Sequence, residues 1–119
     1  MSNRERGEVG LPLGGVIYTM ALEFETMVKI EELLGKGVFE LFTHAANGTF
    51  TTIQLATIIH CAVIVEDEED RPSLSQVGAL ILAEGVSNLI TPIGLFFTMA
   101  VNGGQQPAKK KRAPAKKKK

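Results

Sequence analysis

The sequence has little cysteine and lacks an export signal. Cys61 is the single cysteine among 119 residues, so no disulfide can form within the chain. This excludes a disulfide-stapled secreted scaffold and fits a reducing compartment. The N-terminal segment MSNRERGEVG carries basic residues, but the apolar stretch of a secretory signal does not follow it. We therefore expect a cytoplasmic protein.

Basic residues are scarce except at the end of the chain. Residues 1–108 contain five basic and 13 acidic residues, a net charge of −8, and the C-terminal segment QQPAKKKRAPAKKKK carries +8. The neutral total therefore averages two opposed charge distributions. The basic residues of the tail are Lys109, Lys110, Lys111, Arg112, Lys116, Lys117, Lys118 and Lys119.

Motifs of catalysis and of phosphate or metal binding are missing. The triplet Gly35-Lys36-Gly37 lacks both the glycine spacing and the Ser/Thr of a phosphate loop. His60 and Cys61 are neighbours, so on a helix they diverge by about 100° and cannot chelate one metal together. We interpret them as a core histidine beside a small buried thiol. No nucleophile motif occurs, so we predict no enzyme activity, cofactor or small-molecule substrate.

Five consecutive acids form a second electrostatic segment. They lack the glycine and the alternate spacing of a calcium loop, so we expect a solvated loop. Glu31, Glu32 and Glu84 are expected to face solvent or a helix end. The five acids are Glu66, Asp67, Glu68, Glu69 and Asp70.

The first 21 residues predict a β-hairpin. Residues 8–11 and 16–21 alternate apolar with small or polar residues around a Pro-Leu-Gly-Gly turn, where Gly14 and Gly15 can adopt positive φ. An isolated hairpin is only marginally stable, so we expect it to pack on helices.

Five helical segments follow the hairpin. The first ends at Gly35 and Gly37, the second at Asn47-Gly48, and the fourth begins with the capping box Ser73-x-x-Gln76. The third, within residues 49–65, is rich in β-branched residues, but its length favours a helix capped by Thr49 or Thr51. The fifth is predicted to begin with Thr91 as N-cap and Pro92 at its first position, and to end at Asn102.

The apolar faces predict which side chains pack inward. We expect the following inward positions: Phe24, Met27, Val28, Ile30 and Leu34 in the first helix; Val38, Leu41, Phe42 and Ala45 in the second; Ile53, Ala56, Ile59, His60, Val63 and Ile64 in the third; Leu74, Val77, Leu80 and Ile81 in the fourth.

These patterns predict a mainly α fold: an N-terminal β-hairpin packed on a bundle of about five short helices. We expect one small domain in residues 1–103 and a disordered Lys-rich tail in residues 104–119. A membrane span is the alternative for residues 85–108, which contain no charged residue until the basic cluster. The compact apolar part, residues 89–101, is shorter than the roughly 20 residues needed to cross a bilayer, which favours a core helix.

An ordered set of residues resembles a small family in the tail-gene module of gene transfer agents and related siphophages. The similarity covers about residues 3–101 and excludes the tail; the acidic segment also departs from the family pattern. The residues that carry it are Arg6-Gly7-Glu8, Tyr18, Phe24, Ile30-Glu31, Gly35, Gly37 and Leu41.

The resemblance implies a tail assembly chaperone that binds the tape measure protein in the cytoplasm of a bacterial host and keeps it soluble. The tail tube protein is a possible second partner, and the family implies no catalytic residue. The alternatives are a structural tail tube subunit, mostly β, or a small holin-like membrane protein. We expect Phe39, Phe42, Phe96 and Phe97 to contribute to the partner surface, although ordinary core is the simpler fate for at least half of them.

The basic tail has two open interpretations. It lacks interleaved aromatic or glycine residues, so we favour electrostatic docking to an acidic body, or solubilisation, over nucleic-acid binding. Alternatively, its lysine codons overlie a slippery messenger sequence, since the longer form of many tail assembly chaperones arises by a programmed frameshift. A plain basic tail remains the simpler alternative.

Overall fold

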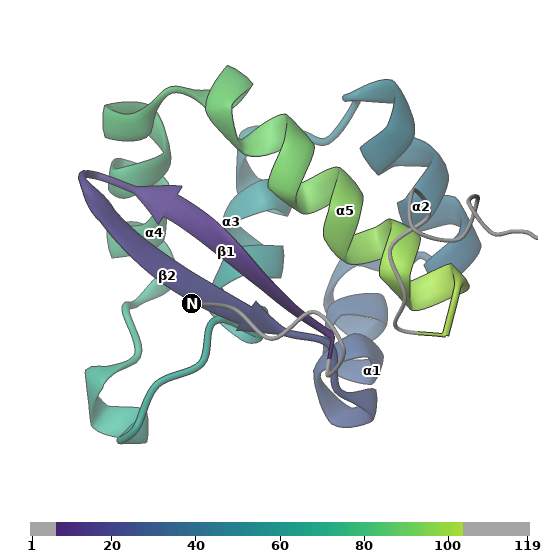
Figure 1. Ribbon diagram of the computed structural model, residues 1–119, viewed down its shortest axis with the longest axis horizontal. Helices are drawn as coiled ribbons and strands as arrows, with labels where there is room; N and C mark the ends of the chain where they lie inside the picture. Colours follow the sequence, from purple (N-terminus) through teal and green to yellow (C-terminus); the bar gives the residue numbers. More distant parts are fainter. Residues whose placement is uncertain (1–6, 104–119) are drawn as a thin grey trace, which may run out of the picture.

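The computed structural model describes residues 7–103, which form a two-stranded hairpin and five α-helices (Figure 1). This confirms the predicted mainly α fold with an N-terminal hairpin. The predicted tail lies outside the described residues, and the domain boundary at residue 103 stays a prediction. The elements are β1 (Glu8–Leu13), β2 (Val16–Ala21), α1 (Phe24–Leu34), α2 (Val38–Asn47), α3 (Thr52–Ala62), α4 (Leu74–Glu84) and α5 (Ile90–Val101), with 3₁₀ turns η2 (Glu68–Asp70) and η3 (Val86–Leu89).

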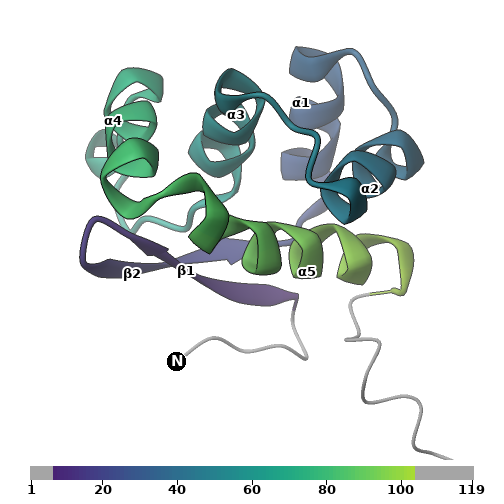
Figure 2. The same cartoon turned by 90° about the horizontal axis from the view of Figure 1, so that it is seen from above.

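The elements pack in two layers. Figure 2 shows the hairpin and α5 in one layer and α1 to α4 in the other. Helix α2 packs mainly on α5, while α3 lies between α1 and α4. The hydrophobic core fills the space between the layers. The largest fully buried side chains are Leu11, Leu13, Met20, Ile30, Leu41, Ile58, Ile59, Ile81, Leu89, Ile93, Phe96 and Phe97.

The hairpin extends two residues further along β1 than predicted. β1 pairs with β2 from Glu8–Ala21 to Leu13–Val16, and Pro12 stands opposite Ile17. The closing pair of a two-residue hairpin exchanges hydrogen bonds, so the next pair directs its backbone groups away from the partner strand. Pro12 therefore removes no ladder bond, which is why the strand can run through it.

Replacing Gly14 with Ala should destabilise the protein more than the same change at Gly15. Both glycines have positive φ, 60° and 88°, which costs an L-residue about 1 kcal/mol. A Cβ on Gly14 would also lie 2.8 Å from Cδ2 of Leu80, whereas the space around Gly15 is open. We expect urea titration to show a loss of about 1 kcal/mol for Gly15→Ala and about 2 kcal/mol for Gly14→Ala. Equal losses would contradict close packing of the turn against α4.

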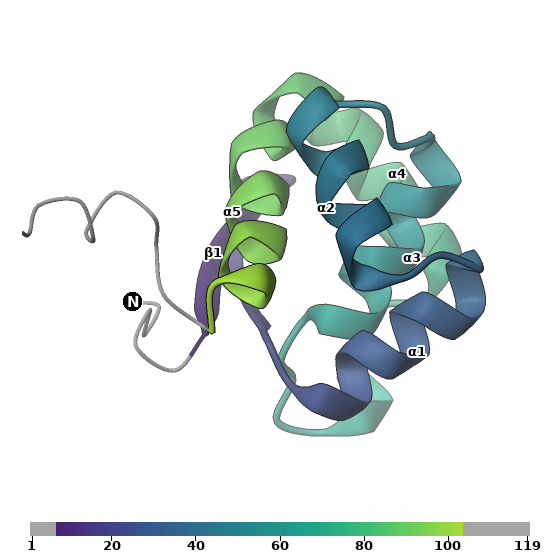
Figure 3. The same ribbon diagram turned by 90° about the vertical axis from the view of Figure 1, so that its right-hand side faces the viewer.

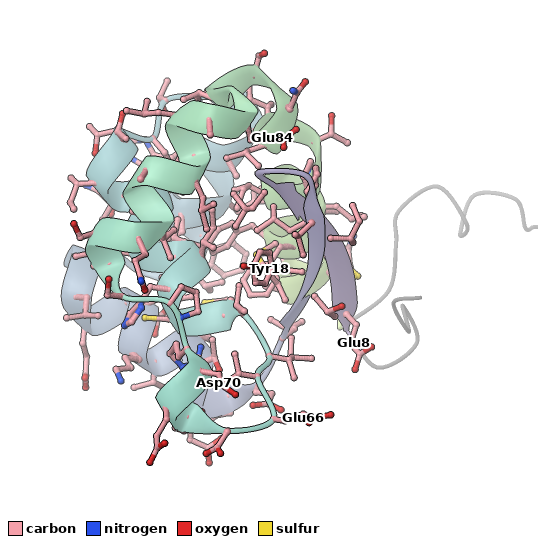
Figure 4. All side chains as sticks on the ribbon, turned by 90° about the vertical axis from the view of Figure 1, so that its left-hand side faces the viewer. Glu8, Tyr18, Glu66, Asp70 and Glu84 are labelled. Atoms are coloured by element: carbon pink, nitrogen blue, oxygen red, sulfur yellow. The ribbon has the colours of Figure 1, made fainter. Side chains whose placement is uncertain are left out.

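Polar contacts fix both ends of the hairpin to the helices. At the tip, the Gly14 N–H donates to Glu84 Oε1 at 3.2 Å. At the other end, the Ile64 N–H donates to the Thr19 carbonyl at 2.8 Å, next to the bridge between Met20 and Val63. Glu84 lies at a helix end, as expected, and Figure 4 shows it at the opposite end of the molecule from the acidic turn.

Helices α1 and α2 end where the sequence predicts, at Gly35 and Gly48. Ile30 and Leu41 are fully buried, in agreement with their predicted inward positions. Phe24 is the exception, with 79% of its side chain exposed. The inward prediction for Phe24 is wrong: the residue begins the helix, and at this end its side chain stays exposed.

The ambiguous third segment is a helix, and Thr51 is its cap. The Thr51 hydroxyl accepts from the Gln54 N–H, and the Gln54 side chain accepts from the Thr51 N–H, forming a capping box. The predicted inward positions of Ile53 and Ile64 are wrong, since both are exposed. Because α3 is packed between α1 and α4, its buried face is broad and centred on residues 55–59.

The start of α4 is confirmed and the start of α5 is corrected. The predicted capping box joins Ser73 and Gln76, although Leu74 is exposed. Helix α5 begins at Ile90, directly after η3, so Thr91 is not its N-cap. Pro92 is the third helical residue, still within the first turn, where N–H groups have no partner inside the helix.

Candidate functional site

The four phenylalanines predicted for a partner surface differ in how deeply they are buried. Phe96 and Phe97 are fully buried, so their placement on an accessible surface is corrected: they belong to the core. Phe42 is half-buried against the same core. Phe39 is 72% exposed and remains available to a partner. The buried pair lies on the inner side of α5, which faces α2 and the hairpin.

An apolar groove opens where α1 begins, α2 begins and α5 ends. Its volume is about 320 Å³. Figure 3 shows α5 beside α2, with α1 below them. Phe24, Met27 and Val28 line it from α1, where their spacing places them on one side of the helix. The other apolar lining residues are Leu22, Val38 and Ala100.

The charged side chains that line the groove within residues 7–103 are both acidic, Glu23 and Glu31. Glu31 Oε2 accepts a hydrogen bond from the Val38 N–H at 2.9 Å, so its carboxylate satisfies a free donor at the start of α2. A negative charge there is also favoured by the helix dipole. Glu31 therefore links α1 to the start of α2, two walls of the groove.

Glu31→Ala should lower the free energy of unfolding by about 1 kcal/mol, because it removes this cap. Glu31→Gln keeps an acceptor oxygen and should cost only a few tenths of that amount. Glu32→Ala, at the exposed neighbouring position, is the matched control and should leave the urea midpoint unchanged. Equal losses for Glu31→Ala and Glu32→Ala would contradict the capping role.

The five consecutive acids form an exposed turn, as predicted. Residues 66–70 are all exposed, and Figure 4 places Glu66 and Asp70 at one end of the molecule. Arg71 fixes this turn: its Nε and Nη2 donate to both carboxylate oxygens of Glu68 at 2.9 Å. Its Nη1 donates to the carbonyls of His60 and Val63 at 2.8 and 2.7 Å. Arg71 thus caps the C-terminal end of α3.

The Glu68–Arg71 pair shifts both ionisation equilibria. The hydrogen bond from Arg71 lowers the pKa of the Glu68 carboxyl, and the same bond raises the pKa of Arg71. Because the folded-state pKa of Glu68 is lowered, its stabilising effect is present above the ordinary glutamate pKa of about 4.3. That effect disappears as the pH falls through the lower folded-state value.

His60 and Cys61 line a polar cleft, which corrects their interpretation as buried core residues. Both are half-buried, and they share the cleft with Lys29 and Arg71. His60 Nδ1 lies 2.8 Å from the Pro72 carbonyl, which can only accept, so this nitrogen donates. Partial burial raises the pKa of the Cys61 thiol, which opposes thiolate formation. Within residues 7–103, no three His, Cys, Asp or Glu side chains are arranged to hold a metal ion.

Among the described helices, none is long and apolar enough to span a membrane by itself. Taken together, the segments Leu74–Glu84 and Val86–Val101 are long and apolar enough, but they are bent by 105° relative to each other.

The basic tail residues lie outside the described part of the chain, so the structure gives no position for residues 109–112 and 116–119. Sequence reasoning missed the groove because it treated each helix separately. The available signal was the spacing of Phe24, Met27, Val28 and Glu31, an apolar stripe that ends in an acid.

Comparison with known proteins places the chain in a family. A family model described as phage tail tube protein, GTA-gp10, matches residues 6–103, which confirms the resemblance seen over residues 3–101. No curated protein and no solved structure matches the chain. The family description names a structural tail protein rather than an enzyme. The chain belongs to this GTA-gp10 family of phage tail proteins.

Proposed function

We propose that this protein is a tail assembly chaperone that binds the tape measure protein and keeps it soluble until the tube forms. The observation that supports it best is the number of large apolar side chains exposed on an acidic helical scaffold. Such side chains mark an interaction site where they adjoin other apolar groups, as Phe24 does at the groove beside it. The exposed residues are Val16, Ile17, Phe24, Leu33, Phe39, Ile53, Ile64, Leu74, Leu82, Val86 and Ile90.

The physical requirements of such a chaperone match this surface. A tape measure protein is long, helical and apolar along much of its length, so it is prone to aggregate before tube subunits enclose it. A small partner can cover its apolar stripe, while a strong net charge keeps the complex soluble. Residues 1–108 supply that charge, −8. We place this activity in the cytoplasm of the bacterial host, with the tail tube protein as a second partner.

Co-expression tests the binding step. The tagged full chain should capture full-length tape measure protein from a cell lysate, and a tagged unrelated acidic helical protein should not. Capture that survives washing in 0.5 M salt would support an apolar interface, because salt screens charge pairs but not apolar contacts. Absence of capture, with both proteins expressed, would refute the proposed function.

A structural tail tube subunit is the second candidate, favoured by the family description itself. We expect a tube subunit to be built mostly of β-strands, whereas helices dominate here. Mass spectrometry of purified particles distinguishes the two: a tube subunit is abundant in finished tails, and a chaperone is absent from them. A holin-like protein would instead fractionate with membranes and require detergent.

A further inference from the structure

We propose that the groove between α1, α2 and the end of α5 is the docking site for an amphipathic helix of the partner, with an apolar stripe flanked by Lys or Arg. The proposal rests on the proposed function for the partner's identity and adds the place and chemistry of recognition.

The groove has the shape and lining that such a helix requires. Phe24, Met27 and Val28 form one wall, and Val38 and Ala100 stand on the other sides. A volume of about 320 Å³ holds a small number of aliphatic side chains, not a whole helix. The partner helix would therefore lie across the mouth and insert anchors at i, i+3 and i+4, as in other helix-in-groove complexes.

Phe24 is the most exposed residue of this wall. Its side chain is 79% exposed, although it stands at the edge of an apolar groove. A partner helix would cover it, together with the half-buried Met27 and Val28. Aromatic anchors that become buried near the centre of an interface often carry much of its binding energy.

The acidic side chains around the groove favour basic residues beside the apolar stripe of the partner helix. Glu23 and Glu31 line it, Glu32 is exposed one turn after Val28 on α1, and no described Lys or Arg lines it. Glu25 and Lys29 instead line the polar cleft on another side of α1. Basic residues beside the apolar stripe of a ligand would therefore be attracted, and acidic ones repelled.

The chain's own basic tail is the competing occupant, since α5 ends beside the groove. The lysines of the tail would pair with the acidic residues at the groove, Glu23 and Glu31. The tail sequence, however, contains no Leu, Ile, Val, Phe or Met to fill the apolar interior. The lining of the groove therefore favours a partner helix over the tail.

Two exposed phenylalanines provide a matched test in the full chain. Phe24→Asp changes a groove residue at the first position of α1, where an acid is favoured by the helix dipole, so the fold should be retained. Phe39→Asp changes a similarly exposed residue that does not line the groove. We expect Phe24→Asp to weaken capture of co-expressed tape measure protein at least tenfold, and Phe39→Asp, outside the groove, to weaken it several-fold less. Unchanged binding by Phe24→Asp, with circular dichroism showing an intact fold, would overturn the proposal.

A synthetic probe separates this proposal from the proposed function. The probe is a helical peptide with Leu at i, i+3, i+4 and i+7 and Lys at both ends; its control carries Glu at the ends. The wild-type chain should bind the Lys-flanked peptide at least tenfold tighter than the Glu-flanked one, with dependence on Phe24. If tape measure capture fails while this pattern holds, the groove assignment stands and the proposed function falls. Equal affinity for both peptides would overturn the groove assignment.

A final variant tests the competing occupant. In the full chain, the eight basic tail residues are replaced by Gln. If the groove is open to partners, this variant should bind the Lys-flanked peptide within twofold of the wild type. Binding at least tenfold tighter would assign the groove to the chain's own tail and overturn the proposal.

Discussion

Phe97→Ala is expected to lower the free energy of unfolding by about 3–5 kcal/mol. The Phe97 ring is fully buried, packs edge-on against Phe96 with ring centroids 5.2 Å apart, and lies 5.8 Å from the Phe50 ring. Its removal leaves a cavity between α5 and α2 and abolishes both aromatic contacts, each typically worth about 1 kcal/mol beyond area burial. A loss of this size is a large part of the total stability of a small domain.

Phe39→Ala is the control for this prediction. Phe39 is the same residue type, but 72% of its side chain is exposed, so the change should alter stability by less than about 0.5 kcal/mol. Urea titrations of both variants, followed by far-UV circular dichroism, measure the difference. Similar losses at the two positions would contradict the assignment of Phe97 to the core and Phe39 to the surface.

Arg71→Ala should cost about 2–3 kcal/mol, the second largest expected loss. Arg71 donates to two part-buried carbonyls at the end of α3, and hydrogen bonds from charged donors contribute about 1.5–3 kcal/mol. Removing the guanidinium leaves those carbonyls without this donor and releases the acidic turn. Arg71→Lys should recover only part of the loss, because an ammonium cannot reproduce the planar fork of bonds.

The matched control for Arg71 is Glu68→Gln. Glu68 is fully exposed, so losing its charge should barely move the urea midpoint at pH 7. It should, however, flatten the decrease in stability below about pH 4, because the variant no longer has a carboxyl with a lowered pKa. If Glu68→Gln were as destabilising as Arg71→Ala, the carbonyl contacts would not be the main role of Arg71.

Sequence patterns predicted the helices and strands well because the interactions that begin and end them join residues close together in the sequence. The Ser73–Gln76 capping box and the Gly14-Gly15 turn depend on residues close in sequence, and both occur as expected. The third helix was recognised from length despite its β-branched residues. Its Thr51–Gln54 box was present in the sequence and could have fixed the start.

Burial was harder to predict because it depends on tertiary neighbours. Ile53 follows the helical stripe of α3 yet is exposed, and the residues of this helix that are buried face both α1 and α4. Phe24 begins an apolar stripe, but no element of the described chain covers it. Phe96 and Phe97 are consecutive and both buried, which an amphipathic stripe alone does not indicate.

The prediction of the partner surface was only partly correct for the same reason, because it also depended on burial. An excess of large apolar residues suggested an interaction surface, but the sequence could not separate those needed for the core from those left over. The groove joins residues from α1, α2, α5 and the segment just before α1, separated by up to 78 positions along the chain, from Leu22 to Ala100. Only their arrangement in space identifies Phe24, rather than Phe96 or Phe97, as the exposed aromatic residue of this site.

The solubility of the tape measure protein tests the central proposal most directly. The measurement is the soluble fraction of full-length tape measure protein, by centrifugation and quantitative blotting, expressed alone, with the wild-type chain, or with Phe24→Asp. We predict that the wild-type chain moves most of the tape measure protein into the soluble fraction and that Phe24→Asp does so much less. A soluble fraction that is the same with and without the wild-type chain would contradict the chaperone function.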